Sequence, residues 1–336
     1  MSSIVQVARE AKVAVSTVSL TLNSPQRVRP ATRRKVECAI RQVGYRPRET
    51  AKKCHIGVLY SPGLLIHGVM VDYCRQWIAA VRETFEHQGL DVSVYQIQPH
   101  IDKDPLFFQA LDAGDFNALV TMGVYEKHGY FDAIARKGTP VVVINHPITG
   151  KGIGNVTMDH PEAGRQAAAY LADKGHRRLG LGFLAPGRRA GTEVRQRFLD
   201  EVRRRGLDVP FDLEDISNFD DLPAYEQQAR RVMEAGVTAC FYGSPPAMRL
   251  GNALVALGVQ VPRQVSLLGL DNLGLHIGNK TLTTLDSDTK LMGRLAGQMV
   301  QQMLDGRGEL VRMLATVSTK LIEGQTVAEA RSSSAL

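Results

Sequence analysis

The chain has 336 residues, and its 41 Lys and Arg against 34 Asp and Glu give a net charge of +7. Residues 1–53 contain 12 of the basic and 3 of the acidic residues, so residues 54–336 sum to −2. Positive charge confined to a short segment is typical of a nucleic-acid-binding head, although a solvated basic tail is the alternative. No signal peptide and no long apolar run is found, which argues against an exported or membrane-spanning protein and predicts a cytoplasmic one.

Three helical stretches are predicted in the head. Apolar residues at helical spacing predict a first helix over Ile4–Ala11 and a second over Val15–Leu22, which Asn23–Pro25 ends. Pro30 suits the first position of a third helix, where its missing N–H is not needed, and Gly44 suits its end. The residues expected to face inward are Ile4, Val7, Ala8, Ala11, Val18, Leu22, Val36, Ala39, Ile40 and Val43. Such a unit is a helix-turn-helix, whose second helix would enter the major groove of DNA.

A set of positions in the head follows a known pattern without gaps through Ala51. They are Val7, Ala8, Val13, Ser16–Ser19, Asn23, Val28, Thr32, Arg33, Lys35, Val36 and Gly44–Pro47. On these residues the head resembles the LacI/GalR family of transcription repressors. The resemblance implies operator DNA as a partner, with contacts from Val15, Ser16, Thr17, Leu20, Asn23, Arg27, Arg29, Arg33 and Tyr45. The basic residues would contact phosphates, which fixes the register of the protein on DNA without reading sequence.

Three positions of the head depart from the family. Its members usually have Gly in the turn and Ser capping the second helix, where this chain has Lys12 and Ala14. Losing a Ser cap costs about 1 kcal/mol, so we expect this helix to depend on packing. The family often has Arg where Leu20 stands, and Arg reads guanine through two hydrogen bonds. Because Leu offers only apolar contact, the sequence predicts a half-site lacking that guanine contact; a partly buried packing role is the alternative for Leu20.

Residues 48–55 are expected to link the head to the body. In the family, Pro47 is followed by a short hinge helix that forms on operator DNA and inserts a Leu into the minor groove. That Leu position falls on Cys54 here, and the first strand of the body, Ile56–Tyr60, starts about six residues sooner. We therefore expect a truncated hinge, and a plain basic linker is the alternative.

The body alternates short apolar runs with amphipathic helical stretches. Expected strands are Ile56–Tyr60, Val92–Ile97, Ala118–Met122, Val141–Asn145, Leu179–Phe183, Ala239–Tyr242 and Val265–Leu268. Expected helices are Tyr73–His87, Tyr130–Arg136, Pro161–Lys174, Glu193–Arg205, Ala224–Ala235 and Met248–Leu257. The alternation indicates βαβ units and parallel sheets with helices on both faces. A late helix, Thr289–Leu304, and the strand-like Leu314–Ile322 are expected to cross between two lobes.

The predicted fold class is α/β, with an N-terminal three-helix helix-turn-helix head and a two-lobed core of doubly wound parallel sheets. The expected domains are the head at 1–47, the linker at 48–55, the core at 56–331 and a tail at 332–336. Within the core, the first lobe is expected over about 56–158 and 288–316, and the second over about 159–287 and 317–331. The body also resembles the family, for example at Val156–Asp159, Gly175–Arg178 and Gly269–Asp271. The resemblance implies a periplasmic-binding-protein-like core in which a small molecule between the lobes changes operator affinity.

Six residues are candidates for contact with that effector. Asp271 follows a strand and matches an Asp of the family that often accepts hydrogen bonds from a ligand hydroxyl or ring N–H. Arg188, beside Arg189, has the spacing of a ligand-contacting Arg in the family and could bind an anionic or carbonyl-bearing ligand. The remaining candidates, which end strands at the same cleft, are Asn145, Asp159 and His160. The alternatives are a structural turn for Asp271 and a solvated loop for the Arg pair.

The cleft also departs from the family. Many members have Asn-Asp before Met248 and Arg four residues before Phe198, where this chain has Pro245–Pro246 and Val194. The sugar chemistry of the family is therefore not carried over. A neutral monosaccharide is in doubt, and the effectors considered are a sugar, a sugar acid, a phosphosugar and a purine-like molecule.

Two other functions compete with regulation. An enzyme could use the same lobes, but the chain lacks the dinucleotide fingerprint, the P-loop, the zinc-protease motif and the nucleophile elbow. A solute-binding receptor would need an export signal. The four Cys form no C-x-x-C pair and the His are scattered, so no metal and no cofactor are expected. Without a C-terminal heptad helix, the expectation is a homodimeric, sequence-specific DNA-binding transcriptional regulator, a repressor that acts on a two-fold operator.

Overall fold

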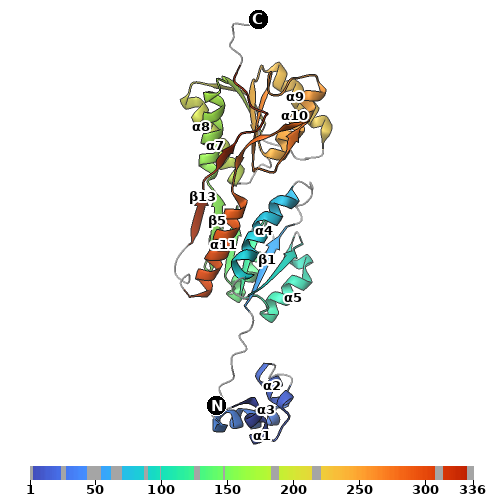
Figure 1. Cartoon of the computed structure of the whole chain (residues 1–336), viewed down its shortest axis with the longest axis vertical. Helices are drawn as coiled ribbons and strands as arrows, with labels where there is room; N and C mark the ends of the chain where they lie inside the picture. Colours follow the sequence, from blue (N-terminus) through green and yellow to red (C-terminus); the bar gives the residue numbers. More distant parts are fainter. Residues whose placement is uncertain are drawn as a thin grey trace. The chain divides into compact units, whose positions relative to one another are not determined.

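A computed structural model describes residues 3–23, 28–43, 54–61, 70–86, 90–98, 100–124, 129–146, 148–182, 189–213, 221–306 and 313–330. The chain divides into two compact units, Met1–Cys54 and His55–Leu336. Figure 1 colours them along the sequence, with the first unit in blue. The first unit is the basic head, and the second is the α/β body.

The head consists of α1 (Ile4–Glu10), α2 (Val15–Asn23) and α3 (Pro30–Val43). A capping box starts α1, in which the Gln6 N–H donates to Ser3 Oγ and the Ser3 N–H donates to Gln6 Oε1. The residues that the three helices bury together are Val7, Ala8, Ala11, Val18, Val36 and Ala39. All six belong to the predicted inward faces, and Pro30 is the first residue of α3 as predicted.

Six parallel strands form the first sheet of the body, in the order β13-β5-β4-β3-β1-β2. They are β1 (His55–Tyr60), β2 (Asp91–Gln96), β3 (Ala118–Met122), β4 (Val141–Ile144), β5 (Ile153–Met158) and β13 (Leu314–Val317). The helices of this first lobe are α4 (Met70–Glu86), α5 (Pro105–Ala113), α6 (Tyr130–Lys137) and α11 (Thr289–Leu304), with a short 3-10 turn at Ile101–Lys103. Helices α4 and α11 lie side by side (Figure 1), because Gly293 lets the backbones approach: a Cβ there would lie 2.5 Å from Trp77 O.

The second sheet repeats this plan in the order β14-β12-β9-β8-β6-β7, with β14 antiparallel to β12. Its strands are β6 (Arg178–Gly182), β7 (Asp208–Leu213), β8 (Ala239–Tyr242), β9 (Ser266–Leu270), β12 (Thr283–Asp286) and β14 (Lys320–Ile322). The helices of this second lobe are α7 (His160–Asp173), α8 (Arg189–Arg204), α9 (Leu222–Glu234) and α10 (Ser244–Ala256). A hairpin of β10 (His276–Ile277) and β11 (Lys280–Thr281) completes it.

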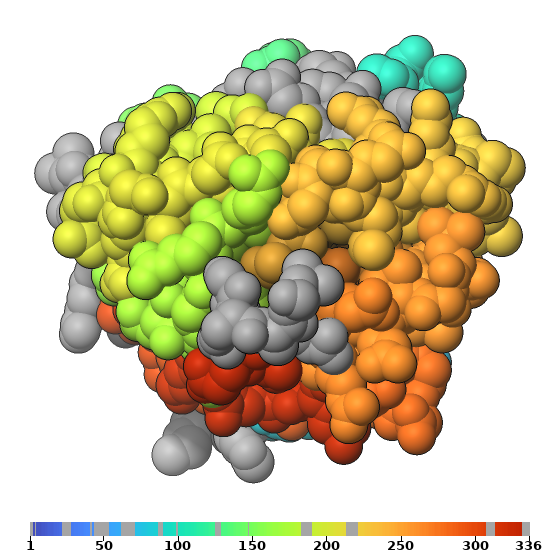
Figure 2. All heavy atoms as spheres, turned by 90° about the horizontal axis from the view of Figure 1, so that it is seen from above, coloured from blue at the N-terminus to red at the C-terminus, as the bar shows by residue number. Residues whose placement is uncertain are grey.

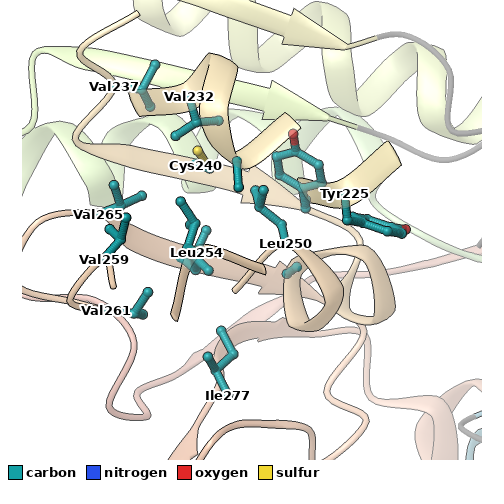
Figure 3. Close-up of a cluster of buried hydrophobic side chains, with 14 of the residues drawn as sticks. Tyr225, Val232, Val237, Cys240, Leu250, Leu254, Val259, Val261, Val265 and Ile277 are labelled. Carbon is teal, nitrogen blue, oxygen red and sulfur yellow. The ribbon is translucent and has the colours of Figure 1, made fainter. Parts of the chain in front are cut away.

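Both faces of the second sheet are covered by helices, as predicted for a doubly wound fold. On one face, Leu250 and Leu254 of α10 and Val232 of α9 pack over Cys240 of β8 (Figure 3). On the other face, the Phe198 ring of α8 stacks on that of Phe241, with 5.5 Å between centroids. Each lobe therefore has its own core, which fixes the strand ends between the lobes.

Three connections join the two lobes, from β5 to α7, from β12 to α11 and from β13 to β14. The last residues of the described chain return to the second lobe. The Ala330 N–H donates to Lys174 O at 2.8 Å, and His176 Nε2 lies 3.0 Å from Ala328 O. Figure 2 shows this red segment against the green region that contains α7, at the outer end of the lobe.

Several elements differ from those expected from the sequence. Strands β5, β7 and β12 were not expected, because Gly154, Pro210 and the polar Thr283–Thr284 interrupt the apolar runs, and helix α5 was not expected either. Helix α10 begins at Ser244 rather than Met248, since proline is tolerated in a first turn whose N–H groups have no helical partner. Helix α8 begins at Arg189 rather than Glu193, and the strand-like Leu314–Ile322 divides between two sheets.

Candidate nucleic-acid interface and ligand cleft

The outer side of α2 carries the predicted base-reading residues. Val15 and Leu20 are 41% and 39% exposed, and Ser16 is exposed beside them. Val18 and Thr21 are buried on the opposite side of the same helix. Leu20 is thus partly covered by the head and partly open to contacts outside it, so its contact with DNA stays a prediction beside the partly buried packing role.

The turn before α2 explains one departure from the family. Lys12 has φ 52°, in the left-handed region that glycine occupies without steric cost. Ala14 precedes α2 and accepts through its carbonyl oxygen from the Thr17 and Val18 N–H groups at 2.9 and 3.2 Å, but its methyl side chain offers no capping oxygen. The turn is therefore built with two residues that its geometry does not favour.

Exposed cations surround the start of α3. Arg29, Arg33, Arg34 and Lys35 are all exposed, and Arg33 pairs with Glu37 at 3.5 Å. Because both partners of this pair are about half exposed, the pair contributes little to stability. These cations are thus available to phosphates, although the sequence-specific contacts predicted for the head remain predictions.

Several predicted residues lie outside the described part of the chain. They are Arg27, Tyr45, Arg188 and the linker up to residue 53, together with the side chains of Asn23 and Arg189. The truncated hinge and the role of the arginine pair therefore stay predictions. Cys54, at the end of the linker, is half-buried next to β1.

The ends of β4 and β9 occupy equivalent places in the two sheets and share an unusual backbone. Asn145 has φ 58° and Asp271 has φ 70°, a region that Asn and Asp enter more readily than other non-glycine residues. Asn145 Nδ2 donates to Tyr73 Oη at 2.7 Å, and Asn145 Oδ1 accepts from the Met158 N–H at 3.1 Å. Both polar ends of Asn145 are thus used inside the first lobe, which weakens its case as an effector contact.

Tyr73 is a neighbour of Asp271 that the sequence analysis did not identify. It lies in the first turns of α4, is 5% exposed, and comes from the first lobe. Burial raises its pKa, and the nearby negative charge of Asp271 raises it further, while Ser287 and Thr289 oppose the change. A lone Tyr beside charged and apolar residues gave no motif to recognise; only the fold places it next to the second lobe.

Asp271 is the most perturbed acid of the cleft. Burial raises its pKa to about 6, and the charge of Asp286 adds to this, while the nearby Ser287 hydroxyl favours the charged form. Asp271 Oδ1 and Ser287 Oγ are both buried, and neither atom has a hydrogen-bond partner among the described residues. An unpaired buried acceptor is costly, so this atom is available to a ligand that donates a hydrogen bond.

The other candidates at this edge are engaged within the protein. Asp159 caps α7, accepting from the Glu162 N–H at 3.0 Å, and His160 is 5% exposed in the same helix. Ser244, next to Asp271 across the sheet, hydrogen-bonds Leu270 O and the Thr284 hydroxyl. Asp159 thus has a structural role, and the structure brings Asp271 together with Tyr73 instead.

The positions that depart from the family are apolar in the structure too. Val194 is 1% exposed within the core under α7 and α8, and its neighbour Arg195 pairs with Asp212. Pro245 and Pro246 are buried in the first turn of α10. At these three positions the chain therefore has buried packing residues.

Two other features bear on the class of protein. In the described ranges, no cluster of His, Cys, Asp and Glu could hold a metal ion. The same part of the chain has no helix that is long and apolar enough to cross a membrane.

Two sequence families match the chain: residues 3–48 match bacterial regulatory proteins of the lacI family, and residues 168–327 match a periplasmic binding protein-like domain. The HTH-type transcriptional repressor PurR of Proteus mirabilis is 26% identical over 341 residues, covering 98% of each chain. The protein of that name from Pasteurella multocida is 24% identical, covering 92% of this chain and 94% of its own.

Solved structures share the fold. The transcriptional regulator CelR in complex with cellobiose has a TM-score of 0.70 at 20% identity, covering 96% of this chain and 99% of its own. A lac repressor dimer bound to operator and the anti-inducer ONPF has a TM-score of 0.67 at 20% identity, covering 97% and 99%.

A basic three-helix head on a two-lobed core defines a ligand-responsive, DNA-binding transcription regulator. The chain belongs to the lacI family of bacterial regulatory proteins. The predicted family and fold class are confirmed.

Proposed function

We propose that this protein is a cytoplasmic repressor that binds a two-fold operator as a homodimer and has no catalytic turnover. The single observation that carries the proposal is the exposed set Val15, Ser16 and Leu20 on a folded basic head. Residues on such a helix can read base edges in the major groove, while the cations around α3 hold the backbone. The relatives named as repressors support repression rather than activation.

The DNA contacts can be tested on an operator recovered by in vitro selection with the full-length chain. We expect Leu20→Ala to weaken binding to the selected site about tenfold, through loss of an apolar contact such as one to a thymine methyl, with an unchanged salt dependence. Arg33→Ala should weaken binding to all sequences and reduce the salt slope by about one. Val5→Ala, which removes a more exposed apolar side chain on α1, is the control and should have no effect. A selected site that needs guanine opposite Leu20 would contradict the half-site prediction.

We propose further that the effector binds between the lobes and contacts Asp271 and Tyr73. The unpaired Oδ1 of Asp271 and the nearby Tyr73 side chain from the other lobe support this. A ligand that bridges them would favour one orientation of the lobes and so change operator affinity. Arg188 and Arg189 are proposed as additional contacts for an anionic or carbonyl group.

The effector can be sought by thermal shift of the purified protein against sugars, sugar acids, phosphosugars and purines. With a hit in hand, Asp271→Ala should abolish its effect on operator binding while leaving binding without effector intact. Asp286→Asn, a nearby acid without the unpaired buried oxygen, is the matched control and should retain the response. An unchanged response in Asp271→Ala would remove Asp271 from the site.

A further inference from the structure

The outer side of α2 offers DNA only methyl groups and hydroxyls in its described side chains. The helix contains no Lys, Arg, Gln, Asp or Glu, and the side chain of its single amide residue, Asn23, lies outside the described part of the chain. Val18 and Thr21 are buried against the head. The residues left exposed or partly exposed are Val15, Ser16, Thr17, Ser19 and Leu20.

The two apolar residues of this set stand at opposite ends of the exposed arc. At about 100° per residue, Ser19 and Ser16 lie between Val15 and Leu20 around the helix. With a rise of about 1.5 Å per residue, Val15 and Leu20 are about 7.5 Å apart along the axis, which is roughly two base-pair steps of about 3.4 Å. A helix that lies in the major groove would therefore bring them to base pairs about two steps apart.

Hydroxyl and alkyl side chains distinguish bases in different ways. A Ser or Thr hydroxyl both donates and accepts, so it can bond to the edge of any base and discriminates weakly. The bidentate pairs that single out guanine or adenine need Arg, Lys, Asn or Gln. An alkyl side chain instead contacts the C5-methyl group that thymine presents in the major groove. Discrimination by the described side chains of α2 therefore depends on Val15 and Leu20.

We propose that Val15 and Leu20 recognise C5-methyl groups of pyrimidines, so that each operator half-site is read through methyl groups at two positions about two base pairs apart. The inference rests on the proposed DNA-binding function and deepens it, because it names the chemical group that is read. Thymine and 5-methylcytosine carry the same methyl group at C5. A half-site with cytosine at either position would therefore bind more tightly once that cytosine is methylated.

The methyl group can be removed without changing the protein. In an operator selected in vitro with the full-length chain, each thymine is replaced in turn by deoxyuridine, which pairs with adenine in the same way and lacks only the methyl group. The affinity, measured by fluorescence anisotropy at fixed salt, should fall about fivefold per half-site at two positions about two base pairs apart. Cytosine and 5-methylcytosine, each paired with guanine at these positions, separate the two sources of the methyl group. Methylation of the cytosine should raise the affinity about fivefold.

Variants of α2 assign each methyl group to its side chain. Leu20→Ala should lose the effect of deoxyuridine at one position, and Val15→Ala should lose it at the other. Leu20→Arg should exchange the methyl preference for a guanine preference at the same position. Ser16→Ala, on the same side of the helix, is the matched control and should keep both effects of deoxyuridine.

The outcomes separate this proposal from the proposed function. A selected operator that binds equally well with thymine and deoxyuridine throughout would overturn the methyl readout, as would methyl effects that persist in both Leu20→Ala and Val15→Ala. Failure to bind any selected DNA would instead reject the proposed function. The deoxyuridine comparison uses the wild-type protein, so its result stands even where a variant fails to fold.

Discussion

The second lobe holds one acid on its outer face, Glu201, and one at the cleft, Asp271, and their carboxyl groups have opposite surroundings. Glu201 of α8 has a side chain that is 4% exposed and receives hydrogen bonds from Arg204 and Arg205 at 2.6–2.7 Å. Hydrogen bonds from Arg204, with Arg205 adding to them, lower its pKa to about 2. At the cleft, burial raises the pKa of Asp271 to about 6, and no cation of the described chain pairs with it.

The contrast separates a structural acid from one that is open to a ligand. A buried carboxylate whose oxygens all accept hydrogen bonds fixes the packing of its helix and has no free acceptor for a ligand. A carboxyl with one buried, unpaired oxygen costs stability, and such groups concentrate at functional sites. Asn145 in the first lobe belongs with Glu201 in this respect, because both of its polar ends are satisfied.

The largest effect is expected from Glu201→Gln. Losing the charge weakens the hydrogen bonds that Arg204 and Arg205 donate to this carboxylate, although Arg205 keeps its pair with Asp173. The free energy of unfolding at pH 7 should therefore fall by about 3 kcal/mol. Urea denaturation followed by circular dichroism would measure it. Glu226→Gln, which breaks an exposed pair with Arg230 on α9, is the control and should change stability by less than about 0.5 kcal/mol. Equal effects of the two variants would erase the contrast between buried and exposed acids.

Asn145→Ala should cost about 2 kcal/mol, because it leaves the Met158 N–H and the Tyr73 hydroxyl without their present partners. Alanine at a positive φ adds strain. Asn145→Gly removes the same hydrogen bonds without that strain. The difference in stability between the two variants therefore measures the cost of a positive φ at this position. If Asn145→Ala were as stable as the wild type, the view of Asn145 as a structural residue would be wrong.

The sequence was informative where physical patterns are local. Helical spacing identified the buried face of the head, down to Val18 and Val36, and apolar runs located β3 and β8 to the residue. It missed Tyr73, because its role depends on two lobes meeting rather than on its neighbours in the chain. It put Asp271 first but kept Asp159 as a further candidate, since both follow strands. Only the hydrogen bond to the Glu162 N–H shows that Asp159 is a helix cap.

The two acids should also give opposite pH dependences of stability. Because folding lowers the pKa of Glu201, its contribution is complete above about pH 4.5 and is lost as the pH falls towards 2. Because folding raises the pKa of Asp271, its penalty is absent below about pH 4 and grows until about pH 6. Asp271→Asn should therefore gain up to about 2 kcal/mol over the wild type at pH 7.5 and nothing near pH 4. Urea denaturation across this range measures the difference, and a gain that does not vary with pH would contradict the titration of Asp271.

The smallest effect tests whether backbone strain in the turn before α2 lowers the stability of the head. Lys12, in the turn before α2, has a left-handed backbone like that of Asp271. Lys12→Gly should stabilise the head by about 1 kcal/mol by removing strain, which slows amide exchange in α1 and α2 of the full-length chain about fivefold. Lys12→Ala removes the same charge but keeps the strain, so it should not slow exchange. If both variants slow exchange equally, the charge of Lys12 and not its backbone is what destabilises the turn.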